Sequence, residues 1–179
     1  PKKIHGVYPK NLMLPDTPDA LEEQLLDLLP ELKNCAYMIL DSSSSMLTTA
    51  KGKHLTGASG YRVEIPIADG SKIPEFMEKL HKICWALDYG WAWVGAAGDI
   101  FLRSYVDLAL KSPHQPDYAV AELRDGIKQD RRFLVRDGKF FDPDAIKPLS
   151  KTEEADAVSN MVEARTELEL VAKKVKAKV

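Results

Sequence analysis

The sequence predicts a protein of the α+β class, with a mainly antiparallel sheet covered by helices on one side. Residues 61–68 alternate apolar and polar side chains, which is typical of a half-buried strand. Residues 75–89 carry a continuous apolar stripe at helical spacing. Residues 91–103 contain two short apolar runs joined by a glycine-containing turn, as in a hairpin. A hairpin makes neighbouring strands antiparallel, and an amphipathic helix needs an apolar surface to cover, so these stretches together indicate the class.

Length and composition suit one globular domain with a helical appendage. The chain has 179 residues, of which 45% are hydrophobic and 29% are charged, and its net charge is −2. These values indicate a soluble globular protein rather than a disordered or membrane protein, because no apolar run approaches the roughly 20 residues of a transmembrane helix. We expect a domain over residues 1–149, a helical extension over residues 150–179 and no membrane partner.

Charge and cysteine content limit the partners, the metal sites and the redox compartment that we expect. A near-neutral balance argues against a general nucleic-acid coat but leaves room for a local basic groove. Cys35 and Cys84 both lie in apolar runs, so we expect two buried thiols in a reducing cytoplasm and no structural zinc site. No signal peptide is visible, and a start at Pro1 is expected of an excised fragment.

The first half of the chain is expected to run from a helix into two strands. After an aperiodic arm, residues 19–29 have leucines at helical spacing and Pro30 stops the helix. An apolar strand over residues 36–40 ends on Asp41. The polar connection over residues 42–60 is long for a compact domain, and such loops are usually functional or mobile.

The helix over residues 75–89 is expected to pack on the sheet, with Pro74 in its first turn and His81 and Lys82 toward solvent. Trp91 and Trp93 belong to the hairpin that follows. They are expected to pack the sheet against a helix, and the alternative is that they stack bases.

The last third of the chain is less regular until its final helix. Residues 118–123 are typical of a strand, and residues 133–141 are typical of a hairpin around Asp137-Gly138. From Ser150 a capping box with Glu153 begins a helical region, acidic at its start and lysine-rich at its end. We expect one long helix or two over residues 150–178.

Two acids and a few basic residues are candidates for chemistry. Asp41 ends a buried strand, where a carboxylate is costly unless something uses it, and the alternative is that it caps a turn. Asp107 lies between apolar residues, and the alternative is a first-turn helix acid. His54 is either functional or solvated, and the cluster of Lys128, Arg131 and Arg132 either binds phosphate or is a solvated face.

Four segments together resemble the primase-polymerase domains of plasmid, phage and integrated-element replication proteins, in the archaeo-eukaryotic primase superfamily. They are ILDSSSS, SGYRVEIPIADGSKIPEF, LDYGWAWVGAAGDIFLRSYVDLALKSP and DGIKQDRR, within residues 35–135. The resemblance implies an RRM-like catalytic sheet with three motifs. These are an Asp-x-Asp pair ending a strand, a small residue followed by any residue and a histidine, and a hydrophobic residue followed by Asp.

Carried over by position, the resemblance assigns Asp41 to the first motif and Asp107 to the third, as ligands of Mg²⁺ or Mn²⁺. Ile39 stands where the second acid of the first motif would be. Arg62, after Ser59, Gly60 and Tyr61, takes the place of the histidine and could hold a nucleoside triphosphate. Glu64, on the same strand face, is a replacement acid or the salt-bridge partner of Arg62. Further candidate phosphate contacts are Ser59, His54, Arg103, Lys128, Arg131 and Arg132.

Three functions follow as hypotheses. The first is a primase or primase-polymerase that transfers nucleotides on a single-stranded DNA template, with a helicase as possible neighbour. The second is a non-catalytic RRM-like nucleic-acid-binding domain. The third is a protein-binding scaffold whose contact is the C-terminal helix, residues 150–179.

Overall fold

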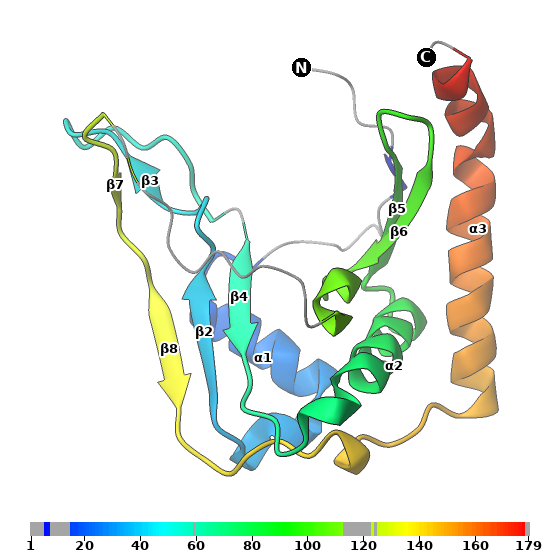
Figure 1. Cartoon of the computed structure of the whole chain (residues 1–179), viewed down its shortest axis with the longest axis horizontal. Helices are drawn as coiled ribbons and strands as arrows, with labels where there is room; N and C mark the ends of the chain where they lie inside the picture. The colour runs from blue at the N-terminus through cyan, green and yellow to red at the C-terminus, as the bar shows by residue number, and fades with distance from the viewer. Residues whose placement is uncertain (1–5, 8–14, 59, 113–122, 124, 178–179) are drawn as a thin grey trace. The chain divides into compact units, whose positions relative to one another are not determined.

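The computed structural model describes residues 6–7, 15–58, 60–112, 123 and 125–177, and its elements are antiparallel strands, helices and a long C-terminal helix, as the α+β class requires (Figure 1). The chain divides into two compact units. Unit 1 contains residues 1–12, 71–115 and 147–179, and unit 2 contains residues 13–70 and 116–146. Each unit is described by itself.

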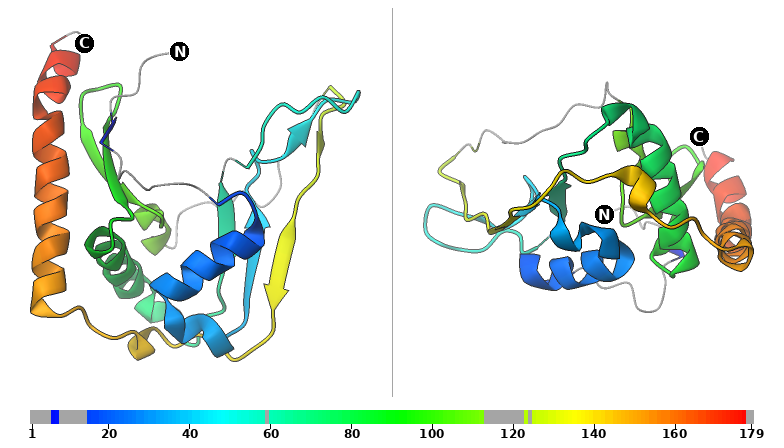
Figure 2. Two further views of the ribbon diagram at one scale, coloured as in Figure 1. Left: turned by 180° about the vertical axis from the view of Figure 1, so that it is seen from behind. Right: turned by 90° about the horizontal axis from the view of Figure 1, so that it is seen from below.

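Unit 2 is built on a three-stranded antiparallel sheet of order β4-β2-β8. The strands are β2 (Tyr37–Asp41), β4 (Tyr61–Glu64) and β8 (Phe133–Arg136). Helix α1 (Pro18–Leu28) begins at Thr17, whose hydroxyl accepts from the Ala20 amide at 3.2 Å, and is followed by the 3₁₀ helix η1 (Pro30–Asn34). The helix lies on the face of the sheet that carries Tyr37, since the Tyr37 hydroxyl donates to Glu22 of α1 (Figure 2).

The long connection after β2 contains a strand of its own. β3 (Leu47–Thr48) pairs antiparallel with β7 (Lys128–Gln129), so this polar stretch forms an ordered extension of unit 2. The predicted hairpin around Asp137-Gly138 is wrong, because β8 pairs with β2, far away in the sequence. A Cβ on Gly138 would lie 2.5 Å from the carbonyl carbon of Cys35, so the chain there passes against the β2 segment. The strand predicted over residues 118–123 lies almost entirely outside the described residues.

Unit 1 contains a second three-stranded antiparallel sheet, of order β1-β5-β6. Its strands are β1 (Gly6–Val7), β5 (Gly90–Val94) and β6 (Ile100–Ser104), and β5 and β6 form the predicted hairpin. Helix α2 (Ile73–Ala86) has Pro74 in its first turn, as predicted. The single helix α3 (Lys151–Lys176) begins with the predicted capping box of Ser150 and Glu153. The remaining 3₁₀ helices are η2 (Gly70–Lys72), η3 (Leu108–Lys111) and η4 (Pro143–Ala145).

The core of unit 1 lies between its sheet and the two helices α2 and α3. Its buried residues are Trp85, Ala92, Val94, Ala157, Ala164, Leu168 and Ala172. Gly90 is required at the start of β5, because a Cβ there would lie 2.2 Å from the ring of Trp85. Both cysteines are buried and free, as predicted.

Two expectations for unit 1 are corrected by this packing. His81 is buried rather than solvated, and its Nδ1 lies 2.9 Å from the Ser104 hydroxyl of β6, whereas Lys82 is exposed as expected. The residues of β5 that pack against the helices are Ala92 and Val94, so the tryptophans do not pack the sheet against a helix.

Candidate functional site

Asp41 lies at the end of β2 and is completely buried, with an exposed fraction of 0%. Arg132 grips its carboxylate: Nε donates to Oδ2 and Nη2 donates to Oδ1, both at 2.9 Å, and the Arg132 amide donates to Oδ2 at 2.9 Å. Burial alone would raise the pKa of Asp41, but these hydrogen bonds and the positive charge of Arg132 outweigh it, so the pKa lies below its usual value. In return, the hydrogen bond to Asp41 raises the pKa of Arg132.

Arg132 also fixes two further segments of unit 2. Its Nη1 donates to the carbonyl of Asp16, and its Nη2 lies 3.4 Å from the hydroxyl of Tyr61. That hydroxyl donates to the carbonyl of Pro15 at 2.7 Å. Arg132, predicted as a phosphate contact, is therefore the centre of a partly buried network that joins β2, β4, the residue before β8 and the segment before α1.

The metal that the resemblance implies does not fit Asp41 in this arrangement, because both carboxylate oxygens already accept charge-assisted hydrogen bonds. Across the described residues, no group of three or more His, Cys, Asp or Glu side chains could hold a metal ion. We therefore derive no chemistry through a metal at Asp41.

Asp107 belongs to unit 1, whereas Asp41 belongs to unit 2. It is the N-cap of η3: its Oδ1 accepts from the Ala109 amide at 3.1 Å and from Arg103 Nη1 at 3.1 Å. Both Asp107 and Arg103 keep substantial exposure, so this is a surface cap and ion pair.

The remaining predicted residues of unit 2 lie on two features. Arg62 and Glu64 are in β4, and the register pairs them with Leu40 and Met38, so they project from the face opposite Tyr37. His54 is exposed and pairs with Thr48 beside β3. Lys128 lies in β7, and Arg131 Nε donates to Gln129 Oε1 at 3.0 Å. Ser59 lies outside the described residues.

The face of the unit 1 sheet opposite α2 and α3 brings together residues that the sequence named only separately, the tryptophans as alternative base-stacking groups and Arg103 as a phosphate contact, and it adds Phe101. Cross-strand register pairs Trp93 with Phe101 and Trp91 with Arg103, and the alternation of each strand turns these four side chains away from the core. We call them the aromatic face. The rings of Trp93 and Phe101 lie 5.5 Å apart between centroids, and the Arg103 guanidinium lies 5.8 Å from the Phe101 centroid.

The aromatic face is accessible. Phe101 is 40% exposed, and both tryptophans are partly exposed. Just beyond the two strands, Tyr89 and Tyr105 stack with centroids 4.9 Å apart. The sequence Ile-Phe-Leu-Arg could have indicated this face. Once the hairpin register is known, Phe101 and Arg103 alternate with Ile100 and Leu102, which pack against the core.

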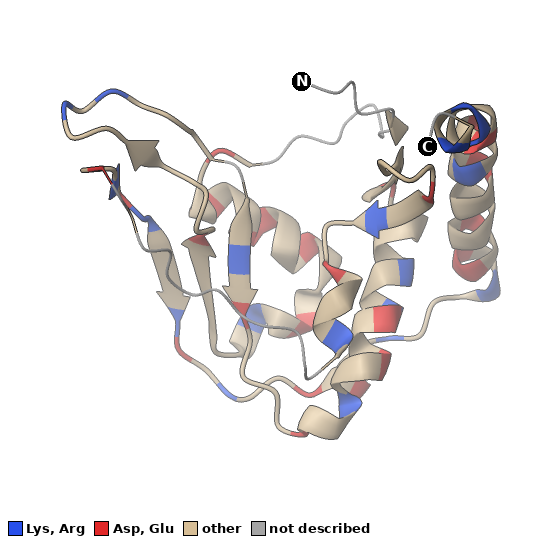
Figure 3. Ribbon diagram, turned by 45° about the horizontal axis from the view of Figure 1, so that its top comes forward, with Lys and Arg blue, Asp and Glu red and all other residues tan. Residues whose placement is uncertain are grey.

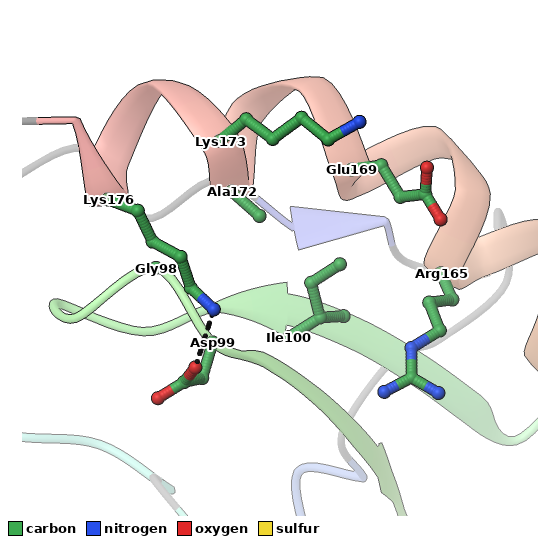
Figure 4. Close-up of a pocket in the computed structure, with 8 residues that line it drawn as sticks. All are labelled: Gly98, Asp99, Ile100, Arg165, Glu169, Ala172, Lys173 and Lys176. Carbon is green, nitrogen blue, oxygen red and sulfur yellow. Dashed lines mark ion pairs between the residues drawn. The ribbon is translucent and has the colours of Figure 1, made fainter.

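A separate hollow of about 430 Å³ lies in unit 1 between the β5–β6 turn and the C-terminal half of α3 (Figure 4). Lys176 Nζ pairs with Asp99 Oδ1 at 3.1 Å, and Arg165 extends over the hairpin (Figure 4). The lining residues are Gly98, Asp99, Ile100, Arg165, Glu169, Ala172, Lys173 and Lys176. None of them is a residue that the sequence singled out, and their charges are mixed.

Comparison of the chain with protein-family models, curated proteins and solved structures finds no match. The candidate site therefore rests on the geometry of this chain. Within the described residues, no helix is long and apolar enough to cross a membrane.

Proposed function

We propose that this protein binds single-stranded DNA through the aromatic face of unit 1, as a non-catalytic domain of the RRM-like kind. The observation that carries the proposal is the pair Trp93 and Phe101, turned away from both helices, with Arg103 beside the Phe101 ring. A sheet that needed only a core would leave this face polar, because the opposite face already packs on α2 and α3.

The chemistry of single strands fits this face. Unpaired bases stack on aromatic side chains, and each such contact contributes about 1–3 kcal/mol with little dependence on sequence. The Arg103 guanidinium can contact a phosphate or stack on a base, since its ion-pair partner Asp107 is an exposed acid that water can replace. A chain with a net charge of −2 binds DNA through such local groups rather than through a general positive field.

The test is the affinity of a fluorescent single-stranded oligodeoxynucleotide for the whole chain, measured by anisotropy at several salt concentrations. Phe101→Leu should weaken binding about tenfold, because one stacking contact is lost. Arg103→Gln should reduce the slope of log affinity against log salt by about one, because one phosphate contact is lost. Phe133→Leu is the matched control, since Phe133 is 71% exposed on the sheet of unit 2.

If Phe101→Leu and Phe133→Leu weakened single-strand affinity equally, the aromatic face would not be the binding site. An unmodified chain that binds no single strand at any salt concentration would reject the function itself.

A second candidate is nucleotidyl transfer on a single-stranded DNA template, as in the primase-polymerase family that the sequence resembles. It is favoured by Asp107, which stands at the position of the third motif and whose exposed carboxylate makes only a surface ion pair that a metal ion could replace. Asp41 takes no part in metal binding in this candidate, because Arg132 occupies both of its carboxylate oxygens.

Incorporation of labelled ribonucleotides and deoxyribonucleotides, with Mg²⁺ or Mn²⁺, tests this candidate. It is supported if incorporation is lost in Asp107→Asn and kept in Asp142→Asn. Both aspartates cap 3₁₀ helices, so the two variants carry the same structural change. Absence of incorporation by the unmodified chain rejects catalysis and leaves the binding proposal standing.

A further inference from the structure

A basic arm extends the sheet of unit 2. It consists of residues 46–56, which include β3, and residues 127–131, which include β7 (Figure 1). Residues 46–56 contain Lys51, Lys53 and His54 and no acid, and all three side chains are exposed. Basic segments gather toward the end of this arm (Figure 3). We refer to residues 46–56 and 127–131 as the β-arm.

The end of the β-arm is a closed hairpin. The Thr49 amide donates to the Lys53 carbonyl at 2.8 Å, and the Leu55 amide donates to the Leu47 carbonyl at 2.8 Å. Gly52, with a φ of +79°, makes the turn, and its amide donates to the Thr49 carbonyl at 2.9 Å. This turn holds Lys51 and Lys53 at the tip.

Side-chain hydrogen bonds connect the base of the β-arm to neighbouring segments of unit 2. The Gln129 side-chain amide donates to the carbonyls of Ser42 and Ser45, at 2.9 and 2.7 Å. The hydroxyl of Ser45 donates to the Gly60 carbonyl at 2.9 Å, which joins this turn to the start of β4. These bonds tie the base of the β-arm to the turn after β2 and to the start of β4, so side-chain hydrogen bonds hold the β-arm to the rest of unit 2.

The charge of the β-arm is positive even with its acids counted. The cations are Lys51, Lys53, Lys128 and Arg131, and the acids are Asp130 and Asp125, whose neighbour Gly126 lies beside Ala50 at the tip. In the part of the chain that the structure describes, neither Lys51 nor Lys53 has an ion-pair partner. The positive charge of these two lysines is therefore available to an anionic partner.

We propose that the β-arm is a second nucleic-acid contact, which places its hairpin tip in the major groove of double-stranded B-form DNA. The major groove is about 12 Å wide and admits a two-stranded β-ribbon. Lysines at the tip then reach phosphates on the walls of the groove, which positions the chain without reading sequence. A-form RNA duplexes have a major groove too narrow for this. This contact is separate from the aromatic face.

The experiment measures affinity for a blunt DNA duplex and for an RNA duplex of the same sequence, across a salt series. Lys51→Gln/Lys53→Gln should reduce the slope of log affinity against log salt on the DNA duplex by about two, because two phosphate contacts are lost. The control is Lys33→Gln/Lys139→Gln, which removes the same charge from exposed lysines of unit 2 away from the β-arm. The control should leave the slope unchanged.

Single-strand affinity separates this inference from the proposed function, because the β-arm variant should keep it and Phe101→Leu should lose it. An unchanged DNA-duplex slope in the β-arm variant overturns the inference. So does an equal loss on the RNA duplex, an equal loss in the lysine control, or an unmodified chain that does not bind duplex DNA. None of these results affects the single-strand proposal.

Discussion

The two three-stranded sheets of this protein differ in which face carries their charged residues. In unit 2, the face toward α1 carries ion pairs: Arg132 grips the buried Asp41, and Arg136 binds Glu22 of α1 through two hydrogen bonds of 2.7 Å. In unit 1, the face toward the helices carries Ala92 and Val94, and the groups able to bind a ligand lie on the other face.

This difference distinguishes charges that hold the fold together from charges that stay exposed and available to a ligand. A buried pair is expensive to form and more expensive to break, so Asp41 and Arg132 fix the ends of their strands and have little freedom to bind anything else. An exposed cation such as Arg103 contributes little to folding, which leaves it available to a ligand. The same residue types therefore form a structural pair in unit 2 and an exposed surface pair in unit 1.

The largest expected effect is that of Arg132→Met. This change leaves Asp41 charged in a site with an exposed fraction of 0%, and the free energy of unfolding should fall by about 3–5 kcal/mol. Asp41→Asn should cost less, about 1–3 kcal/mol, because the Arg132 side chain is 32% exposed and keeps some water. Urea unfolding at pH 7, followed by circular dichroism, measures both.

Arg136→Met provides the control for this prediction. Arg136, in β8, makes a bidentate pair with shorter hydrogen bonds of 2.7 Å, but its side chain is half exposed, so its removal should cost clearly less. In Arg132→Met the burial of Asp41 remains without the guanidinium, so the pKa of Asp41 should rise above its value in the unmodified chain. The stability deficit of this variant should then shrink as the pH is lowered. An equal cost for both arginines would remove the distinction between buried and exposed pairs.

A smaller effect is the loss of folding stability at low pH, which should begin at different pH values for His81 in unit 1 and Asp41 in unit 2. Burial lowers the pKa of His81 in unit 1, so the unfolded chain binds a proton more readily than the folded one, and stability falls as pH drops below about 6.5. The pKa of Asp41 is lowered too, so its contribution is complete above about 3.9 and is lost only as pH falls further.

The expected result is therefore an early loss of stability, starting near pH 6.5, that is absent in His81→Gln and kept in Asp41→Asn. Urea midpoints measured between pH 7 and pH 4 give the comparison. A His81→Gln variant that follows the unmodified chain through this range would show that another group titrates there.

Local patterns predicted much of the fold. The apolar stripe of α2, the alternation of β4 and the capping box of α3 all depend on neighbours within a few residues, and each element is present. The hairpin expected around Asp137-Gly138 failed because a turn signal does not say which strand pairs with the next one. The prediction that His81 faces solvent is wrong because His81 lies beside Leu80 and Cys84 on the buried side of α2, and that position outweighs its polar type.

The site was less predictable, because its contacts are distant in sequence. Asp41 and Arg132 were both singled out, one as a metal ligand and one as a phosphate contact, and the structure joins them to each other across 91 positions. Nothing in either segment encodes that pairing. The aromatic face needed only the β5–β6 register, which the short turn fixes locally, so it was within reach of the sequence.

The smallest expected effect is that of Asp107→Ala. This change removes the cap of a four-residue 3₁₀ helix and an exposed ion pair, so it should cost about 1 kcal/mol. Asp142→Ala removes the corresponding cap of η4 and should cost a similar amount. Asp107→Asn keeps a capping oxygen and should unfold at nearly the same urea concentration as the unmodified chain. If Asp107→Ala instead cost as much as Arg132→Met, Asp107 would have to be classed with the buried charges of unit 2, and the contrast between the two sheets would not extend to this segment.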